Sequence, residues 1–212
     1  MNAREEVLAR IRGALGEAPT AAPVPRAYRR VSDHDPGSRE LVDRLVDRLA
    51  DYRATVLRSG ADDRSIGQAV ADALAPLATP RTDRAITAPG VPGDWVARLS
   101  GVVVDDGTLT ARELDRIPAV VTGSVLAIAD TGTIALDGTP LCGRRAITLV
   151  PDTHVCVVRV KDVVDTVPEG LARLDPRRPL TLISGPSATS DIELTRVEGV
   201  HGPRTLIVIV AG

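Results

Sequence analysis

Short apolar runs rich in valine and isoleucine recur along this chain, and they constrain its fold more than any other feature. The sequence contains no Phe and only 1% aromatic residues, so valine, leucine, isoleucine and alanine must build the core. Strands rich in such β-branched residues are typical of parallel sheets that are buried on both faces. Strand candidates alternate with helical segments, and they span 85–88, 102–104, 119–129, 133–136, 147–150, 155–160, 180–183 and 206–210. We therefore expect one α/β domain with a mostly parallel sheet.

Asp130-Thr131-Gly132 separates two of these runs and indicates a tight antiparallel hairpin inserted into the domain. Gly132 would adopt the left-handed conformation that such a hairpin loop requires. The triplet also resembles the catalytic Asp-Thr-Gly of aspartic proteases, but the alternating helices argue against the all-β dimer that such a site needs. Because hairpin tips project their side chains, Asp130, Thr131 and Thr133 are candidates for contacting a ligand.

The N-terminal region differs from the rest in composition. Asn2 as N-cap, Glu5 three residues later and an apolar stripe of Val7, Ile11 and Leu15 predict an amphipathic helix over residues 1–16. Residues 17–37 are rich in Pro and Ala and indicate a linker, which leaves 38–212 as the α/β domain. A short helix on such a tether is typical of an arm that docks to a partner or folds back on its own core.

Two longer helices are expected to follow the linker. The first begins after Ser38, and its inward face carries Leu41, Leu45, Leu49, Tyr52 and Val56. The second begins at Asp62 or Asp63 and ends before Pro80. Shorter helical segments are expected at 94–99, 110–117, 162–174 and 190–198.

Charge and cysteine content exclude several classes of function. The formal net charge is −2, and the arginines are interspersed with Asp and Glu, so nucleic-acid binding has no support. Cys142 and Cys156 are the only cysteines and do not form a Cys-x-x-Cys pair, so we expect no zinc or iron–sulfur site, and no cofactor, on this chain. No signal peptide and no membrane-spanning run is evident, which predicts a cytoplasmic protein with reduced, buried cysteines.

The loop Ser184-Gly185-Pro186-Ser187 is the strongest candidate for binding an anion. It follows strand 180–183 and precedes the helix expected at 190–198, which leads to strand 206–210 in a closing βαβ unit. Ser184, Gly185, Ser187 and Ser190 would then surround a helix N-terminus at the carboxyl edge of the sheet, where α/β proteins hold anions. The alternative is a plain loop in which Ser190 and Glu193 form a capping box.

His154 and His201 are possible secondary site residues, as a general base or as a metal-binding pair. However, His201 precedes the last expected strand, whereas Ser184 ends the previous one. A simple βαβ unit places them at opposite edges of the sheet. Each histidine is therefore interpreted primarily as a structural residue that bonds to backbone.

Four ordered blocks over the last ninety or so residues resemble the LUD-domain family, in particular its LutC-type lactate-utilisation members. The blocks are Ala127-Ile128-Ala129-Asp130-Thr131-Gly132-Thr133, Pro151-Asp152-Thr153-His154-Val155, Ile183-Ser184-Gly185-Pro186-Ser187 with Ser190-Asp191-Ile192-Glu193, and Gly199-Val200-His201-Gly202-Pro203-Arg204. Asp130 stands where the family usually has Glu, which shortens the carboxylate's reach by one methylene.

The resemblance implies an open three-layer α/β/α sandwich similar to the sugar-phosphate isomerases and CoA transferases. It also implies a cluster-free subunit of a multi-protein system that oxidises L-lactate to pyruvate, with iron–sulfur clusters on partner subunits and a small carboxylate or phosphate as ligand. Two alternatives stay open: a stand-alone isomerase or acyl/CoA-transfer enzyme, and a non-catalytic assembly factor. No catalytic residue is assigned.

Overall fold

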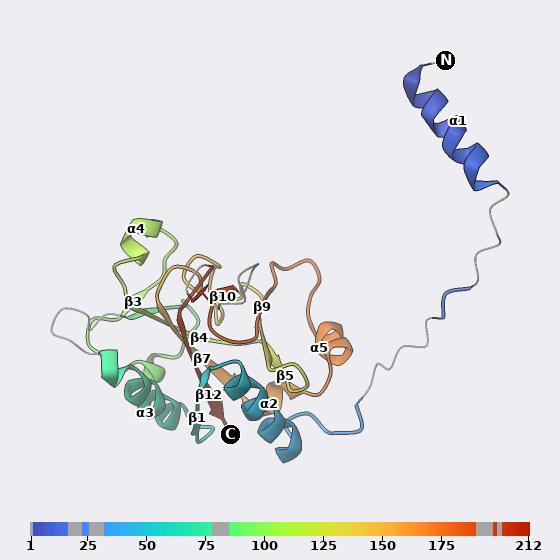
Figure 1. Ribbon diagram of the computed structural model, residues 1–212. Helices are drawn as coiled ribbons and strands as arrows, with labels where there is room; N and C mark the ends of the chain where they lie inside the picture. Colours follow the sequence, from blue (N-terminus) through green and yellow to red (C-terminus); the bar gives the residue numbers. More distant parts are fainter. Residues whose placement is uncertain (1, 17–22, 26–31, 78–84, 190–196, 199–200) are drawn as a thin grey trace.

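The computed structural model describes residues 2–16, 23–25, 32–77, 85–189, 197–198 and 201–212 (Figure 1). Its helices are α1 (Ala3–Leu15), α2 (Arg39–Asp51), α3 (Asp63–Leu74), α4 (Ala111–Leu114) and α5 (Val167–Arg173), with short 3-10 turns η1 (Ala75–Leu77), η2 (Gly93–Trp95) and η3 (Val160–Asp162). Its strands are β1 (Thr55–Ser59), β2 (Ala85–Thr87), β3 (Val103–Val104), β4 (Ala119–Gly123), β5 (Leu126–Ile128), β6 (Thr133–Leu136), β7 (Thr153–Arg159), β8 (Val163–Val164), β9 (Thr181–Ile183), β10 (Ala188–Thr189), β11 (Val197–Glu198) and β12 (Thr205–Ala211).

The main sheet has six parallel strands in the order β1-β12-β7-β4-β2-β3. Its two longest strands, β7 and β12, lie side by side near the middle, and their apolar side chains alternate between two core clusters on opposite faces. Each fully buried Val, Ile or Leu there contributes about 1.5–3 kcal/mol relative to exposure. The expected mostly parallel α/β sheet built from branched aliphatic residues is confirmed.

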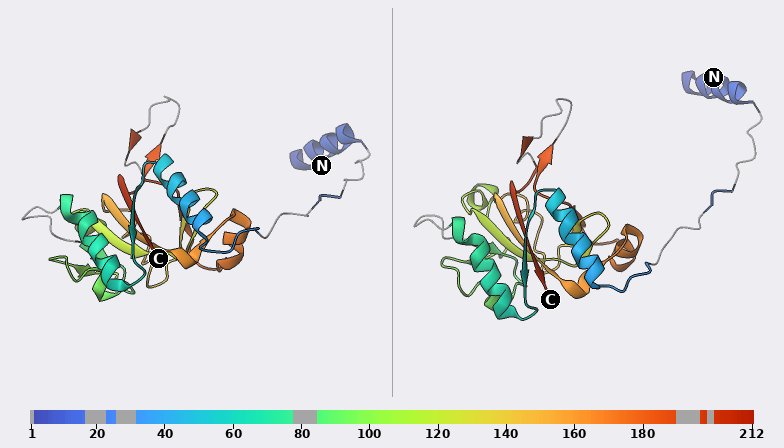
Figure 2. Two further views of the ribbon diagram at one scale, coloured as in Figure 1. Left: turned by 90° about the horizontal axis from the view of Figure 1, so that it is seen from below. Right: turned by 60° about the horizontal axis from the view of Figure 1, so that its bottom comes forward.

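Different elements cover the two faces of this sheet (Figure 2). α3 covers one face through Ile66 and Val70. α2 covers the other through Leu41, Leu45 and Leu49, together with a second sheet of four strands in the order β8-β5-β6-β9. The inserted hairpin is β5–β6 of this second sheet, and Gly132 at its tip has φ +60°, as expected.

Strand assignments were wrong where the partner of a strand depends on distant parts of the chain. The run 119–129 is two strands, because the chain leaves the main sheet after Gly123 and enters the second sheet at Leu126. β9 pairs antiparallel with β6 and does not neighbour β12, so the expected closing βαβ unit does not form. Residues 147–150 form turns instead of a strand.

Helix boundaries also differ from the expectation. α2 ends at Asp51 because the chain turns through Arg53, at φ +67°, and Val56 then lies in β1. The segment expected at 94–99 is only the 3-10 turn η2, and α5 begins at Val167, after β8. Most of the helix expected at 190–198 lies outside the described residues, and Val197–Glu198 is strand β11, paired with β10.

α1 forms with the expected capping box: the Asn2 side chain accepts from the Glu5 N–H and the Glu5 carboxylate accepts from the Asn2 N–H. None of its residues is buried, and Figures 1 and 2 show it standing apart from the α/β domain. No helix in the described part of the chain is both long and apolar enough to cross a membrane.

Candidate functional site

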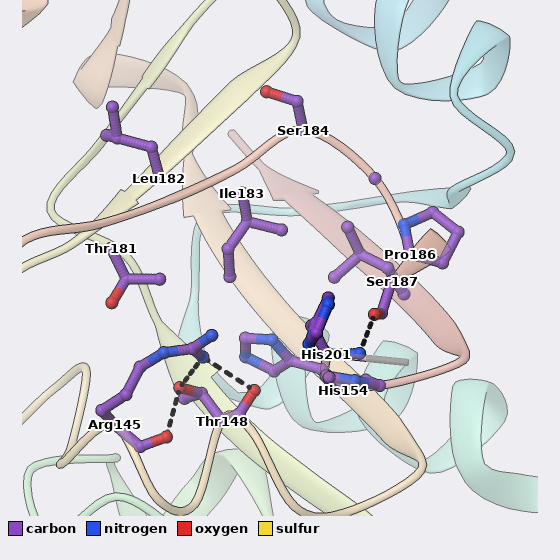
Figure 3. A pocket seen from close by; sticks show the side chains of 14 residues that line it. Arg145, Thr148, His154, Thr181, Leu182, Ile183, Ser184, Pro186, Ser187 and His201 are labelled. Atoms are coloured by element: carbon purple, nitrogen blue, oxygen red, sulfur yellow. Dashed lines mark hydrogen bonds between the residues drawn. The ribbon is translucent and has the colours of Figure 1, made fainter. Parts of the chain in front are cut away.

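A cavity of about 270 Å³ lies at the amino-terminal ends of β7 and β12 (Figure 3). It is bounded by the loop after β9, the turn before β12 and the loop that leads into β7. Its described lining residues are Arg145, Thr148, His154, Thr181, Leu182, Ile183, Ser184, Gly185, Pro186, Ser187, His201, Gly202, Pro203 and Leu206. None of them is a carboxylate, so the cavity combines a cation and hydroxyl groups with apolar walls.

The structure brings the Ser184–Ser187 loop and His201 together, and the expectation that Ser184 and His201 lie at opposite edges of the sheet was wrong. The backbone N–H of His201 donates to Ser187 Oγ (3.0 Å), and the backbone N–H of Ser187 donates to the Pro203 carbonyl (2.8 Å). Because β9 belongs to the second sheet, its exit is free to lie over the entry to β12. The candidate site is therefore at the amino edge of the main sheet, and the argument from a carboxyl edge is overturned.

Hydroxyl groups link the hairpin to the Ser184–Ser187 loop. Thr131 Oγ1 lies 2.7 Å from Thr133 Oγ1, which lies 2.8 Å from Ser184 Oγ. Asp130 does not line the cavity: it is exposed at the hairpin tip, where its carbonyl accepts from Arg48 Nε (3.2 Å). The structure thus connects Thr131 and Thr133 to Ser184 and leaves Asp130 outside this group.

Gly185 has φ +129°, and a Cβ there would lie 2.8 Å from Tyr52 Cβ and 3.0 Å from the Tyr52 carbonyl oxygen. A side chain at this position would force the loop away from the end of α2. The loop therefore needs glycine for close packing, a reason that the sequence did not reveal. Ser190, the remaining member of the expected anion site, lies outside the described residues.

Arg145 is a cavity residue that the sequence analysis missed. Its Nη1 donates to the Thr148 carbonyl (3.3 Å) and to Thr148 Oγ1 (3.2 Å), while Thr148 Oγ1 donates to the Arg145 carbonyl (3.1 Å). Thr148 is 2% exposed, so a buried hydroxyl orients the guanidinium. Within the described residues Arg145 forms no ion pair, which leaves its charge available to an anion. Sequence alone does not distinguish it from the other scattered arginines.

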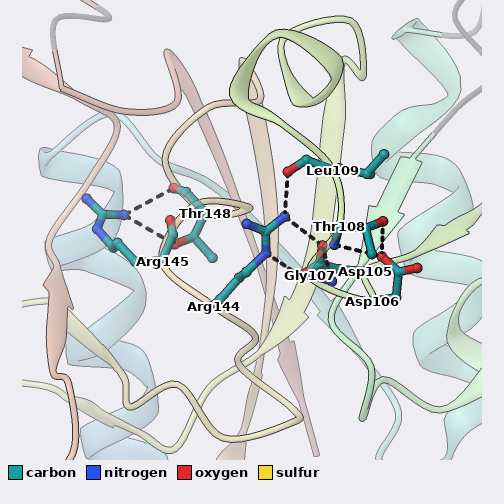
Figure 4. Close-up of polar contacts among 8 residues, drawn as sticks. All are labelled: Asp105, Asp106, Gly107, Thr108, Leu109, Arg144, Arg145 and Thr148. Carbon is teal, nitrogen blue, oxygen red and sulfur yellow. Dashed lines mark hydrogen bonds and ion pairs between the residues drawn. The ribbon is translucent and has the colours of Figure 1, made fainter.

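The neighbouring Arg144 points the other way and holds the loop in place (Figure 4). Its Nε and Nη2 donate to the two carboxylate oxygens of Asp105 (2.8 and 3.0 Å), and Nη2 also donates to the Leu109 carbonyl (3.1 Å). Asp105 follows β3, at the edge of the main sheet. This bidentate pair therefore ties the loop that carries Arg145 to the sheet.

His154, the second residue of β7, is 1% exposed, and its Nε2 lies 2.8 Å from Thr122 Oγ1. Burial, and secondarily the charge of Arg145, lowers the pKa of His154 to about 4. The imidazole is therefore neutral near pH 7 and is a weak base there. It bonds a side-chain hydroxyl, whereas the sequence analysis expected a backbone partner.

Acid is expected to destabilise the protein through His154. Its folded pKa of about 4 lies below the 6.5 of an ordinary imidazole, so below pH 6.5 the unfolded chain binds the extra proton more readily. This residue should remove about 3 kcal/mol from the free energy of unfolding as the pH falls from about 6.5 to about 4. Urea unfolding at several pH values measures it. His154→Gln, which can still bond Thr122, should show a shallower pH dependence; an identical slope in both proteins would contradict the assignment.

Both cysteines are free and buried, as expected. Burial raises the pKa of the Cys156 thiol to about 12 and also raises the pKa of Cys142. Neither thiol is therefore activated as a nucleophile at neutral pH. No group of three or more His, Cys, Asp or Glu side chains that could hold a metal ion is found among the described residues, and His154 and His201 have no third ligand there.

Three kinds of comparison with known proteins point to one family. The LUD domain family model matches residues 87–211. Lactate utilization protein C of Deinococcus radiodurans is 43% identical over 95% of this chain and 90% of that protein. Lactate utilization protein C of Bacillus subtilis (strain 168) is 28% identical over 47% of this chain and 44% of that protein. A crystal structure of a DUF162 family protein from Deinococcus radiodurans has a TM-score of 0.67 and 40% identity, covering 82% of this chain and 97% of that one.

Proposed function

Because the chain belongs to the LUD domain family, we propose that it is a subunit of a multi-protein system that oxidises L-lactate to pyruvate. It is a homologue of lactate utilization protein C over nearly its whole length. In this proposal the chain carries no cofactor of its own and works in the cytoplasm with partner subunits that hold iron–sulfur clusters. Such a division is needed because side chains alone handle hydrides and single electrons poorly.

The observation that supports a small carboxylate ligand is Arg145, which forms no ion pair among the described residues and faces a cavity whose described lining has no carboxylate. Asp115 and Asp152 line the adjoining cavity that Arg145 also borders. A guanidinium held by Thr148 presents its remaining N–H groups as a preformed fork, and this geometry matches a carboxylate. Ser184, Ser187 and Thr181 provide hydroxyls around the same space. These groups suit an anion that also carries a hydroxyl or carbonyl oxygen, as lactate and pyruvate do.

The neutral His154, which lines the cavity, fits a binding role better than an acid–base role. In the proposed site Arg145 binds the carboxylate, the serine loop orients the remaining oxygen, and Leu206 and Ile183 limit access of water. The oxidation of lactate itself would take place at the redox groups of the partner subunits.

Growth on L-lactate tests the proposal. A strain that lacks this gene should fail to grow on L-lactate yet grow on pyruvate, and the wild-type gene should restore growth. The tagged protein should co-purify with cluster-bearing subunits. Normal growth of the deletion strain on L-lactate would overturn the proposal, and turnover of a phosphorylated or acyl substrate by the isolated chain would favour a stand-alone enzyme instead.

A further inference from the structure

The second sheet leaves its outer face uncovered at the edge strand β9. Residues directly opposite each other in antiparallel strands share a face, and Leu182 lies opposite Ala135, which lies opposite Leu126. Leu126 and Ala135 belong to the core cluster on the side away from the main sheet. Leu182 therefore points outward, as Figure 3 also shows, and alternation along the chain places Leu180 on the same side.

α5 covers this outer face only in part. Its Gly170 packs on β5, where an added Cβ would lie 2.8 Å from Ile128 side-chain atoms. The cover does not extend over β9: Leu180 is 41% exposed and Leu182 is 49% exposed, and Leu171 of α5 is 48% exposed. We call Leu180 and Leu182, which share one side of β9 and the residue before it, the outer apolar face. Neighbouring large apolar side chains that are both this exposed are typical of a surface that another element covers.

α1 has a matching apolar surface, which stays exposed alongside the residues that the structure describes. Val7, Ile11 and Leu15 follow one another at spacing four, so they share one side of the helix, and they are 53%, 49% and 71% exposed. The capping box stabilises the helix, but a helix of 13 residues is marginal in water by itself. Packing against an apolar face would bury these three side chains and stabilise the helix.

The connection between the two surfaces is long enough. The chain is anchored on the second sheet at β8, where the Gly37 N–H donates to the Val163 carbonyl (2.8 Å) and Ser32 Oγ donates to the Asp165 carboxylate. β9 is the opposite edge of that sheet, three strand intervals or about 14 Å away. The sixteen residues between Leu15 and Ser32 can span up to about 55 Å. Tethering also raises the effective concentration of α1 near its own domain over that of another copy.

We propose that α1 docks through Val7, Ile11 and Leu15 onto the outer apolar face of its own chain. The docked helix covers the exposed side of the second sheet at β9, the strand that leads into the Ser184–Ser187 loop. This inference depends on neither lactate nor partner subunits, so it can fail while the proposed function holds.

Spin labels on the full-length chain test the docking. The native cysteines are fully buried, so labels would attach to Arg12→Cys on α1 and Ala172→Cys on α5. Pulsed dipolar spectroscopy should show a short, narrow distance that persists when labelled protein is diluted with unlabelled protein. Ile11→Glu and Leu180→Glu should each convert it to a long, broad distribution.

Ala9→Glu is the matched control, because it adds the same charge about 200° around the helix from both Val7 and Ile11. It should keep the short distance. A long, broad distribution of label-to-label distances that is the same with and without Ile11→Glu would overturn the proposal. A short distance that disappears on dilution with unlabelled protein would overturn it in favour of docking onto a second copy.

Discussion

Arg144→Ala lowers the free energy of unfolding by about 3 kcal/mol, because it leaves a buried carboxylate without its counter-charge. The Asp105 side chain is 4% exposed, and each of its carboxylate oxygens accepts a hydrogen bond from the Arg144 guanidinium. Arg144 is 35% exposed, so water can partly replace it, which places the loss at the lower end of the range for buried pairs. Urea or thermal unfolding followed by circular dichroism measures the change.

Arg177→Ala provides the matched control. Arg177 also pairs with an aspartate, Asp175, but its side chain is 89% exposed, so its loss should cost less than about 0.5 kcal/mol. Arg144→Lys keeps the charge but loses the bidentate contact. Its loss of unfolding free energy should fall between those of Arg144→Ala and Arg177→Ala. Equal stabilities for Arg144→Ala and Arg177→Ala would show that the Asp105–Arg144 pair does not hold this loop.

Arg145→Gln lowers the affinity for L-lactate and pyruvate by about 10-fold or more while leaving the fold intact. A hydrogen bond to a charged group contributes about 1.5–3 kcal/mol, which corresponds to this loss. Arg145 is exposed and its bonds to Thr148 stay within one loop, so the free energy of unfolding should change by less than about 1 kcal/mol. Isothermal titration calorimetry with each of the two acids measures the affinity.

The two adjacent arginines serve as controls for each other. Arg144→Lys should weaken stability more than affinity, whereas Arg145→Gln should weaken affinity more than stability. Lactate and pyruvate affinities that are unchanged in Arg145→Gln, or no binding by the unsubstituted protein, would remove Arg145 from the proposed carboxylate site. Either result would leave membership of the LUD domain family untouched, since that rests on the comparisons.

Local patterns predicted the local structure well. The capping box at Asn2–Glu5 forms, a short helix forms within the segment expected at 110–117, and Gly132 adopts its left-handed turn. These features depend on residues only a few positions apart, so the sequence carries all the information that they need. Val56 shows the limit of this approach: it continues the steps of three and four residues from Leu41, yet it lies in a strand, because a short apolar run fits either period.

Several of the candidate residues lie together in the structure, but in a different place from the one expected. Ser184, Gly185, Ser187, His154 and His201 do line one cavity. The serines and His201 were expected to lie apart because β9 was expected to neighbour β12. Arg145 was missed because its availability depends on which carboxylates lie near it in space. Its sequence neighbour Arg144 pairs with a carboxylate, whereas Arg145 forms no ion pair among the described residues.

The sequence by itself determined that this chain forms a mostly parallel α/β sheet with an inserted hairpin, because the order and period of its apolar runs are local properties. It also predicted buried, reduced cysteines, since only two are present and they do not form a Cys-x-x-Cys pair. Only the tertiary structure decided which sheet each strand joins, because strand pairing depends on the burial of faces contributed by distant segments. That choice moved β9 into the second sheet and carried the serine loop to the amino ends of β7 and β12, where the cavity lies.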